Sequence, residues 1–410
     1  MKKKNNENKL VPKLRFPEFV DSGEWEVKKL GDIGEISGNG VDKIKRDGER
    51  EVYLLNYLDV YNNNFVNRDT LKQITTATNT QIEKCYIKKG DIFFTPTSEV
   101  PNDIAISSVA LEDIPDGVYS YHLVRLRLHK QEDWDLKFRT YIFKTKSFFD
   151  QSFRLAQGSG TRYVINLPQF RKISIPIPSL AEQQKIAACL SSLDDLITAE
   201  SQKLELLKEH KKGLLQNLFP QEGETVPKLR FKEFVDSGEW EVKRLGEVLD
   251  YERPDKYIVS SENYNDSGIP VLTANKSFIL GYTNETEGVC KNLPAIIFDD
   301  FTTDKKYVDF PFKVKSSAIK ILRPKGNENL KFIFELMTLI RFEAKEHKRY
   351  YISSYQNLLV PIPKPQEQQK IAACLSSLDD LINAQSQKIE LLQQHKKGLL
   401  QGLFPDLITN

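Results

Sequence analysis

The sequence has 410 residues, of which 40% are hydrophobic, and a formal net charge of +2, so we expect two or more globular domains rather than one. No stretch approaches the roughly 20 apolar residues of a membrane span, and residues 1–6 are followed by no apolar region of the kind found in secretory signals. Four scattered cysteines without a CxxC pair favour neither disulfides nor zinc, and a cytoplasmic protein is expected.

The first element in the chain is a segment that returns in the second half. Residues 11–33 (VPKLRFPEFVDSGEWEVKKLGDI) and residues 226–248 (VPKLRFKEFVDSGEWEVKRLGEV), here called the lead segments, are identical at 19 of 23 positions. A longer segment, residues 182–220, returns as residues 367–405 with 33 of 39 positions identical. This pattern predicts a near-identical frame that holds two dissimilar inserts.

The inserts follow the lead segments and share little sequence with each other. They cover residues 34–174 and residues 249–359, and both contain short runs of β-branched and aromatic residues typical of strands. Helical stretches follow at residues 136–153 and 330–346. Two strand-rich mixed domains are therefore predicted.

Each insert ends on a similar tail, in which an Arg-Tyr pair precedes an isoleucine. An arginine beside an aromatic residue suits DNA, because the guanidinium can fork onto guanine or phosphate and the tyrosine can stack or donate a hydrogen bond. A structural turn with inward-facing tyrosines is the alternative, and polar loops after two predicted strands could likewise read bases or cap turns. The candidate DNA contacts are Thr95, Thr97, Ser98, Arg154, Thr161, Arg162, Tyr163, Thr302, Thr303, Lys305, Lys306, Lys348, Arg349 and Tyr350.

Basic residues gather in both inserts. Residues 137–172 contain eight Lys or Arg and one acidic residue, and residues 305–325 contain seven and one. A single run of this kind is as often a solvated face as a functional one. One run in each half favours a surface that faces phosphates.

The repeated segments 182–220 and 367–405 have core positions at alternating spacings of four and three, the heptad seam of a coiled coil. Ser179 and Glu182 form a capping-box pattern at the first start, and Pro365 suits the first turn of the second helix. Roughly 38 residues would make a rod on the order of 55 Å. Two matching seams predict an antiparallel pair with pseudo-twofold symmetry, and two unrelated amphipathic helices are the alternative.

Each seam is interrupted twice by polar residues, at Glu200 and Lys211 in the first copy and at Gln385 and Lys396 in the second. The predicted helix-pairing residues are Ile186, Leu190, Leu193, Ile197, Leu204, Leu207, Ile371, Leu375, Leu378, Ile382, Ile389 and Leu392.

The predicted fold class is α+β, with two strand-rich mixed domains joined by two long antiparallel helices. The predicted segments are the first domain with its lead segment (1–178), the first long helix (179–220), the second domain with its lead segment (221–363), the second long helix (364–405) and a tail (406–410).

Taken together, these features resemble the specificity subunits of type I restriction-modification enzymes. The resemblance rests on the duplicated EQQKIAACL…DDLI…HKKGLLQ helices, each after an (Ile/Val)-Pro-Ile-Pro segment, and on the duplicated lead segments with two unlike inserts. It covers essentially the whole chain. It implies that each insert is a target recognition domain for one half of an asymmetric, split DNA site, with the helices as a ruler between the half-sites.

The resemblance also implies partners. Two modification subunits would bind S-adenosylmethionine and methylate adenine, and restriction subunits would use ATP and Mg to translocate and cut DNA. This chain would then need no cofactor or metal and would have no catalytic residue. Two domains on a rod of this length agree with contacts to major grooves about one helical turn, roughly 34 Å, apart.

Two other classes of function remain to be weighed. An enzyme would need a signature that the sequence lacks, such as a phosphate loop or a methyltransferase motif; the adjacent carboxylates Asp299 and Asp300 would point to opposite faces of a strand and make a poor metal pair. A coiled-coil adaptor would bind proteins through its inserts, but it would not require the basic runs or the Arg-Tyr tails.

Overall fold

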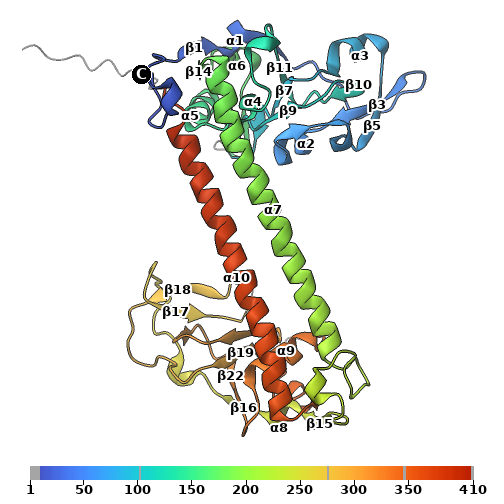
Figure 1. Ribbon diagram of the computed structural model, residues 1–410, viewed down its shortest axis with the longest axis vertical. Coiled ribbons are helices and arrows are strands. Elements are labelled where there is room, and N and C mark those ends of the chain that lie inside the picture. The colour runs from blue at the N-terminus through green and yellow to red at the C-terminus, as the bar shows by residue number, and fades with distance from the viewer. Residues whose placement is uncertain (1–9, 101–102, 275–276, 345–347, 408–410) are drawn as a thin grey trace, which may run out of the picture. The chain divides into compact units, whose positions relative to one another are not determined.

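The computed structural model describes residues 10–100, 103–274, 277–344 and 348–407 (Figure 1). None of the helices in these ranges is long and apolar enough to cross a membrane.

The chain divides into two compact units. The first unit consists of Met1–Glu200 and Lys388–Asn410, and the second of Ser201–Gln387. Each unit therefore contains one insert, one lead segment and a part of both long helices. This differs from the predicted segments, which set each helix apart as a segment of its own, and of the predicted tail only residues 406 and 407 are described.

The first unit is a mixed α/β fold. Its helices are α1 (Leu30–Ile33), α2 (Tyr57–Asn62), α3 (Asn79–Cys85), α4 (Phe138–Ile142), α5 (Lys146–Leu155) and α6 (Leu167–Phe170), with the start of α7 (Leu180–Leu218) and the end of α10 (Pro365–Gly402). Its strands are β1 (Glu26–Lys29), β2 (Gly34–Ser37), β3 (Arg50–Leu55), β4 (Phe65–Val66), β5 (Gln73–Ala77), β6 (Tyr86–Ile87), β7 (Ile92–Phe94), β8 (Thr97–Ser98), β9 (Ser107–Ala110), β10 (Ile114–Tyr119), β11 (Val124–Leu128), β12 (Gln157–Ser159), β13 (Arg162–Val164) and β14 (Ser174–Ile177).

Strand β7 lies in the middle of the first unit, in a sheet of order β2-β11-β7-β9-β4. Its residues alternate between two hydrophobic cores, because successive side chains of a strand point to opposite faces. Ile92 and Phe94 face the core that contains Trp25 and the start of α7, whereas Phe93 faces a second core under the sheet β5-β3-β10-β6. An uninterrupted apolar run thus marks a strand that is buried on both faces.

The second unit has fewer elements. Its helices are α8 (Leu245–Val248) and α9 (Leu330–Leu339), with the end of α7 and the start of α10. Its strands are β15 (Glu241–Arg244), β16 (Leu249–Glu252), β17 (Ile269–Leu272), β18 (Ile279–Thr283), β19 (Ala295–Asp299), β20 (Lys305–Val308), β21 (Lys313–Val314), β22 (Ile319–Pro324) and β23 (Leu359–Ile362).

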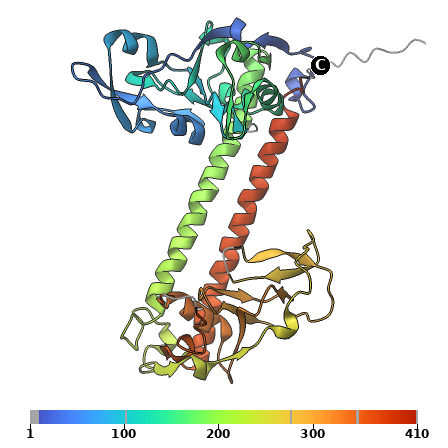
Figure 2. The same ribbon diagram turned by 180° about the vertical axis from the view of Figure 1, so that it is seen from behind.

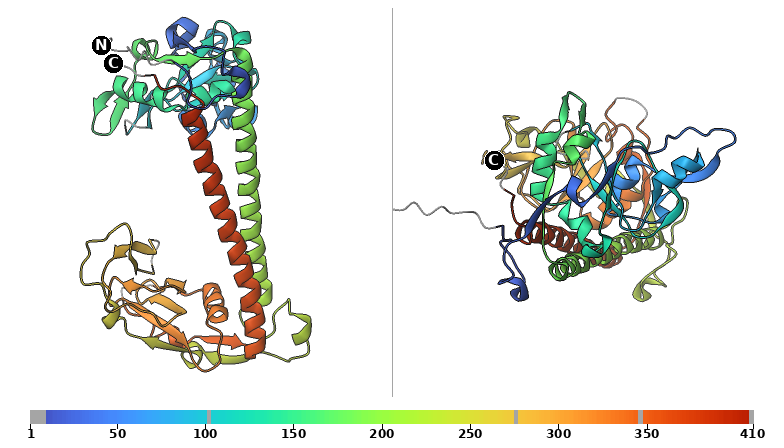
Figure 3. Two further views of the ribbon diagram at one scale, coloured as in Figure 1. Left: turned by 60° about the vertical axis from the view of Figure 1, so that its left-hand side comes forward. Right: turned by 90° about the horizontal axis from the view of Figure 1, so that it is seen from above.

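The second unit repeats the central sheet of the first, with the order β16-β22-β19-β20. Strand β19 corresponds to β7, since Ile296 and Phe298 face one core and Ala295 and Ile297 face another. Helix α9 lies between this sheet and α10 (Figures 2 and 3). The predicted α+β class with a pseudo-twofold repeat is confirmed.

The helical predictions inside the inserts need correction. Residues 136–153 form two helices, α4 and α5, because the side chain of Thr145 caps a new start by accepting a hydrogen bond from the backbone N–H of Phe148. Helix α9 ends at Leu339, short of the predicted residue 346, and residues 345–347 lie outside the described ranges.

The long helices run antiparallel inside each unit. In the first unit Leu403 and Phe404, which follow α10, share a core with Ile186 and Leu190 of α7. In the second unit the end of α7 shares a core with Ile371 and Leu375 of α10 in the same way. All twelve predicted pairing residues are buried or half-buried, and the contacts of the other eight stay a prediction.

Candidate nucleic-acid interface

The same ion pair joins the lead segment to a long helix in each unit. Arg15 in the first lead segment makes a bidentate contact with Glu182 of α7, at 2.8 Å to each carboxylate oxygen. Arg230 and Glu367 repeat it in the second unit with the same distances. All four side chains are at least nine-tenths buried. The predicted capping box is therefore only half formed, because Ser179 accepts from the Glu182 backbone while the carboxylate binds Arg15.

Aromatic side chains complete the anchor in each unit. Trp25 packs edge-on against Phe404 at a centroid distance of 5.9 Å, and Phe404 stacks on Phe138 of α4 at 5.7 Å. Trp240, Phe219 and Phe332 form the equivalent cluster in the second unit. Equivalent aromatic contacts therefore join the lead segment, the end of one long helix and the insert in each unit.

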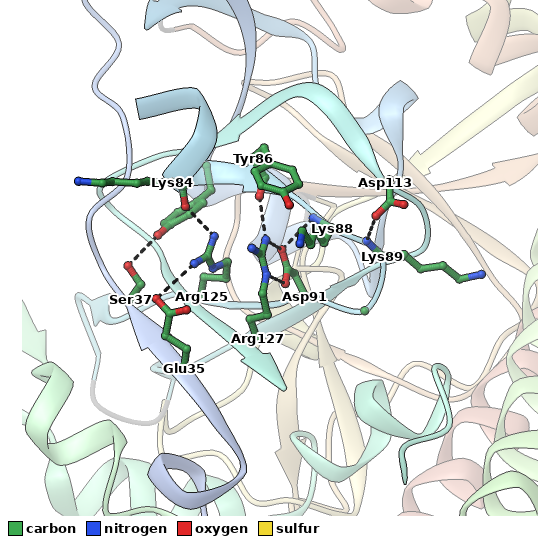
Figure 4. Close-up of polar contacts among 12 residues, drawn as sticks. Glu35, Ser37, Lys84, Tyr86, Lys88, Lys89, Asp91, Asp113, Arg125 and Arg127 are labelled. Atoms are coloured by element: carbon green, nitrogen blue, oxygen red, sulfur yellow. Dashed lines mark hydrogen bonds and ion pairs between the residues drawn. The ribbon is translucent and has the colours of Figure 1, made fainter. Parts of the chain in front are cut away.

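Several basic residues of the first insert have internal partners (Figure 4). Arg127 of β11 makes a bidentate ion pair with the buried Asp91, at 2.7 and 2.6 Å, and donates to the backbone carbonyl of Tyr86. Arg125 donates to the carbonyl of Lys84 at 2.9 Å and lies 3.7 Å from Glu35. These arginines therefore tie β11 to α3, to β6 and to Asp91 within the domain.

The polar loop after β7 forms a small exposed sheet with the Arg-Tyr tail. Strand β13 pairs with β8, with Tyr163 opposite Ser98 and Val164 opposite Thr97, and the backbone N–H of Ile165 donates to the carbonyl of Pro96 at 2.9 Å. The structure therefore brings together the polar loop and the Arg-Tyr tail, which were predicted separately as candidate DNA contacts. Thr161 and Arg162 at the hairpin tip are exposed, as is Arg154, and Thr97, Ser98 and Tyr163 are half-buried.

Thr95 does not belong to this surface. The sheet hydrogen bonds continue one residue beyond β7, since the N–H of Thr95 donates to the carbonyl of Ile106 and its own carbonyl accepts from Ala105. Its side chain is fully buried. The prediction of a DNA contact at Thr95 is wrong for this conformation.

The second unit joins the equivalent segments in a different way. The N–H of Tyr350 donates to the backbone carbonyl of Asp300 at 2.8 Å, and the N–H of Tyr351 donates to the Asp300 carboxylate, which also pairs with the buried Lys320 at 3.1 Å. Asp299 accepts hydrogen bonds from the backbone of Phe301 and Thr302. Both carboxylates are thus committed to the turn, and the alternative of a turn cap holds here.

Burial also removes two other predicted contacts of the second unit. Tyr350 is 4% exposed and packs edge-on against Phe342, and Thr303 is 7% exposed at a left-handed turn position with φ of 61°. Lys305 is half-buried and donates to the hydroxyl of Tyr355 at 3.2 Å, and burial lowers its pKa. Of the remaining predicted residues, Thr302, Lys348 and Arg349 are exposed and Lys306 is half-buried.

The basic run at residues 305–325 is largely paired with acids that lie far away in the sequence. Lys313 pairs with Glu285 at 2.7 Å and Lys320 with Asp300, and both lysines are buried. Arg323 pairs with Glu252. In the first run Arg139 is buried, and its guanidinium donates to three backbone carbonyls and to Gln131. The runs are therefore a weaker sign of a phosphate-facing surface than their charge suggested.

Three exposed residues near the hairpin escaped the sequence analysis. Tyr121 and His122 lie in the turn between β10 and β11 with ring centroids 4.0 Å apart, and Lys43 lies on the loop between β2 and β3. No motif marks them, because only strand pairing brings their loops to the same end of the domain.

Metal ligands and cavities give little chemistry. Over the described ranges, no group of three or more His, Cys, Asp or Glu residues could hold a metal ion. A cavity of about 610 Å³ lies beside the Arg15–Glu182 pair and is lined by side chains of both charges, including Lys28, Asp32 and Asp133. It belongs to the frame and shows no arrangement of a nucleophile with a base.

Comparison with known proteins identifies the family. A family model described as type I restriction modification DNA specificity domain matches residues 22–209 and 237–394. The EcoR124I/EcoR124II specificity subunit of Escherichia coli is 44% identical over 154 residues, which cover 36% of this chain and 38% of that protein. The putative type I restriction enzyme MjaX specificity subunit of Methanocaldococcus jannaschii is 26% identical over 406 residues, or 93% of each chain.

A solved structure shows the same fold. The type I restriction-modification S subunit from M. genitalium superimposes with a TM-score of 0.61 at 18% identity, covering 97% of this chain and 100% of that chain. The family match covers both inserts, the second half of each lead segment and most of each long helix. The chain therefore belongs to the type I restriction-modification DNA specificity family.

Proposed function

We propose that this chain selects the DNA sequence for a type I restriction-modification complex, each insert domain contacting one half of an asymmetric, split site. One observation carries the proposal: the units keep the same frame and differ where the chain leaves the central strand. After β7, residues 97–98 form β8 and pair with a hairpin, whereas after β19 the chain turns back within residues 300–304. A constant scaffold with different loops suits two different contacts of one kind.

The partners follow from the exposed part of the frame. Leu14 and Val20 of the first lead segment are 49% and 59% exposed, and their equivalents Leu229 and Val235 are 47% and 59% exposed. Equal apolar surfaces on both copies suit two copies of one partner. That partner would be the modification subunit, which would carry S-adenosylmethionine, while restriction subunits would carry ATP and Mg. This chain would contribute specificity without chemistry, acting in the cytoplasm, with the helices setting the gap between half-sites.

The test is genome-wide adenine methylation after co-expression with a modification subunit, against a control without this chain. A split, asymmetric motif that depends on the chain would support the proposal and supply both half-sites. Exchange of residues 34–174 for another insert should then change one half of the motif and leave the other half and the gap unchanged.

The adaptor alternative predicts a different result. If the modification subunit is active with another specificity chain but gives no new methylation with this one, the proposal fails. A second experiment tests the exposed residues of the frame. A charged residue introduced at both Leu14 and Leu229 should abolish assembly with the modification subunit while the isolated chain stays folded. Undiminished assembly would place that partner elsewhere.

A further inference from the structure

Three loops of the first unit meet at one end of the central sheet. Strand β11 is antiparallel to β7 with Val124 opposite Phe94, and this register continued places His122 opposite Pro96. Pro96 in turn accepts from the backbone of Ile165, which follows Arg162 on the hairpin. The turn that carries Tyr121 and His122 therefore lies beside the hairpin.

The third loop reaches the same turn from the other side. Val41 donates its N–H to the carbonyl of Tyr119 at 2.9 Å and accepts from the N–H of Tyr121 at 3.1 Å. The backbones approach so closely that a Cβ on Gly40 would lie 2.3 Å from the carbonyl carbon of Ser120. Only glycine allows this approach, and it places Lys43 near His122.

Three exposed basic residues lie at this end, and two carboxylates lie in their neighbourhood: Asp59 interacts with Lys43, and the exposed Glu99 follows Ser98, the residue that pairs with Tyr163. Lys43, His122 and Arg162 are exposed, and among the described residues the Lys43 ammonium and the Arg162 guanidinium make no hydrogen bond or ion pair. Asp42, the acid next to Lys43, pairs with Arg46 at 2.6 Å. Burial, Lys43 and Arg162 all lower the pKa of His122.

We propose that Lys43, His122 and Arg162 form a binding site for a phosphodiester of the DNA backbone, at the tip of the hairpin formed by β12 and β13. The inference rests on the proposed function and names the part of the first recognition domain that fixes its position on the duplex. Phosphate contacts set register, while base contacts set sequence.

A bound phosphate would reverse the electrostatics of His122. A negative charge beside the imidazole favours its protonated form, so the pKa of His122 rises when DNA binds. Near pH 7 the free domain holds His122 mostly neutral, and the complex would take up part of a proton. DNA affinity should therefore increase as the pH falls from 8 towards 6.

The test uses the full chain assembled with its modification subunit and a duplex that contains the motif found by methylation. Proton uptake is measured by titration calorimetry at pH 7 in two buffers with different ionisation enthalpies, and affinity is measured against salt concentration. The variants are His122→Gln, Lys43→Met and Arg162→Met. His129→Gln and Lys72→Met, which change exposed residues of the same unit, serve as matched controls.

The expected results differ for each group. His122→Gln should lose the proton uptake that wild type and His129→Gln show. Lys43→Met and Arg162→Met should each flatten the slope of log affinity against log salt by about 0.9, the value for one phosphate contact, while Lys72→Met should not. The methylated motif should be the same in all variants, because the site reads no base.

Three outcomes would overturn the inference. Unchanged proton uptake in His122→Gln would show that the histidine is not part of the site. Unchanged salt slopes in both Lys43→Met and Arg162→Met would show that these residues contact no phosphate. Inorganic phosphate alone reproducing the full uptake would assign the site to a free anion. If the wild-type complex does not prefer the motif to an unrelated duplex, the proposed function itself has failed, which is a separate result.

Discussion

Lys211 of α7 lies 2.7 Å from Asp379 of α10, and the repeat-equivalent residues Lys396 and Asp194 are paired in the same way in the first unit. Both lysines occupy polar interruptions of the heptad seam. Each of these two lysine interruptions is therefore a cross-helix ion pair, and such polar positions are known to favour one register over others.

The two pairs have different surroundings. In the second unit Lys331 and the buried Glu335 extend the pair, with Lys211 lying 3.2 Å from Glu335. In the first unit Tyr141 donates to Asp194 at 2.8 Å instead. The repeat thus keeps the ion pair while each insert supplies its own neighbour.

Lys211→Met should destabilise the protein more than Lys396→Met. The first change leaves Lys331 as the single cation beside Glu335 and Asp379. Removing one partner of a buried ion pair leaves an uncompensated charge, and we expect a loss of about 2 kcal/mol in the free energy of unfolding because Lys211 is partly exposed. The second change leaves one carboxylate that keeps its bond to Tyr141. Denaturant unfolding of both variants tests this; equal losses would show that the neighbours do not matter.

Gly90→Ala should be more destabilising than Gly48→Ala. Both glycines have a left-handed backbone, with φ of 82° and 81°, which costs an alanine roughly 1 kcal/mol. A Cβ at Gly90 would also lie 2.1 Å from the buried Arg139 guanidinium, whereas Gly48 has nothing within 4 Å. The loss in free energy of unfolding should therefore be larger for Gly90→Ala than for Gly48→Ala. Equal losses in the two variants would contradict the packing around Arg139.

Stability should rise with pH between about 8 and 10.5 because of Lys144. Burial lowers the pKa of Lys144 to about 8 from its ordinary value of 10.5, and the nearby Lys396 lowers it as well. In that window the unfolded chain holds the proton that the folded chain has released, so stability increases with pH. Lys144→Met should raise the melting temperature at pH 7 and flatten this rise, while Lys137→Met, at an exposed position, should do neither.

A circularly permuted chain should fold and direct the same methylation. The N–H of Leu14 donates to the carbonyl of Gly402 at 2.8 Å, as Leu229 donates to Asn217 across the internal junction. A short linker from Asp406, beyond the buried Phe404, to Leu10, with new termini within residues 221–224, would exchange a covalent junction for an equivalent non-covalent one. The methylated motif is the measurement. A chain opened inside β19 is the control and should not fold.

The frame was predictable because duplication reveals it directly. Identical residues in both halves, such as Arg15 and Arg230, mark contacts that must be the same twice. The predicted ends of the long helices lie within three residues of those observed, at 180–218 and 365–402. The partner of Arg15 was not predictable, since Glu182 read as half of a capping box and only tertiary packing brings the lead segment to it.

The contact surface was predicted less well. Arg162 and Ser98 were proposed separately and lie on paired strands, but Thr95, Thr303 and Tyr350 are buried. A polar residue after a strand can continue the sheet or turn inward, and sequence does not distinguish these from an exposed loop. The basic runs misled for a related reason: the acids that pair with Lys313 and Lys320 lie in other segments.

The division of the chain has a consequence for its synthesis. The second unit is one continuous stretch, Ser201–Gln387, whereas the first needs Lys388–Asn410 as well as Met1–Glu200. On the ribosome the second unit can fold as soon as it emerges. The first unit is translated earlier but is complete only when Phe404, which packs against Trp25 and Phe138, has been made. A stalled chain would therefore lack a complete first unit, and only a finished chain would contain both recognition domains.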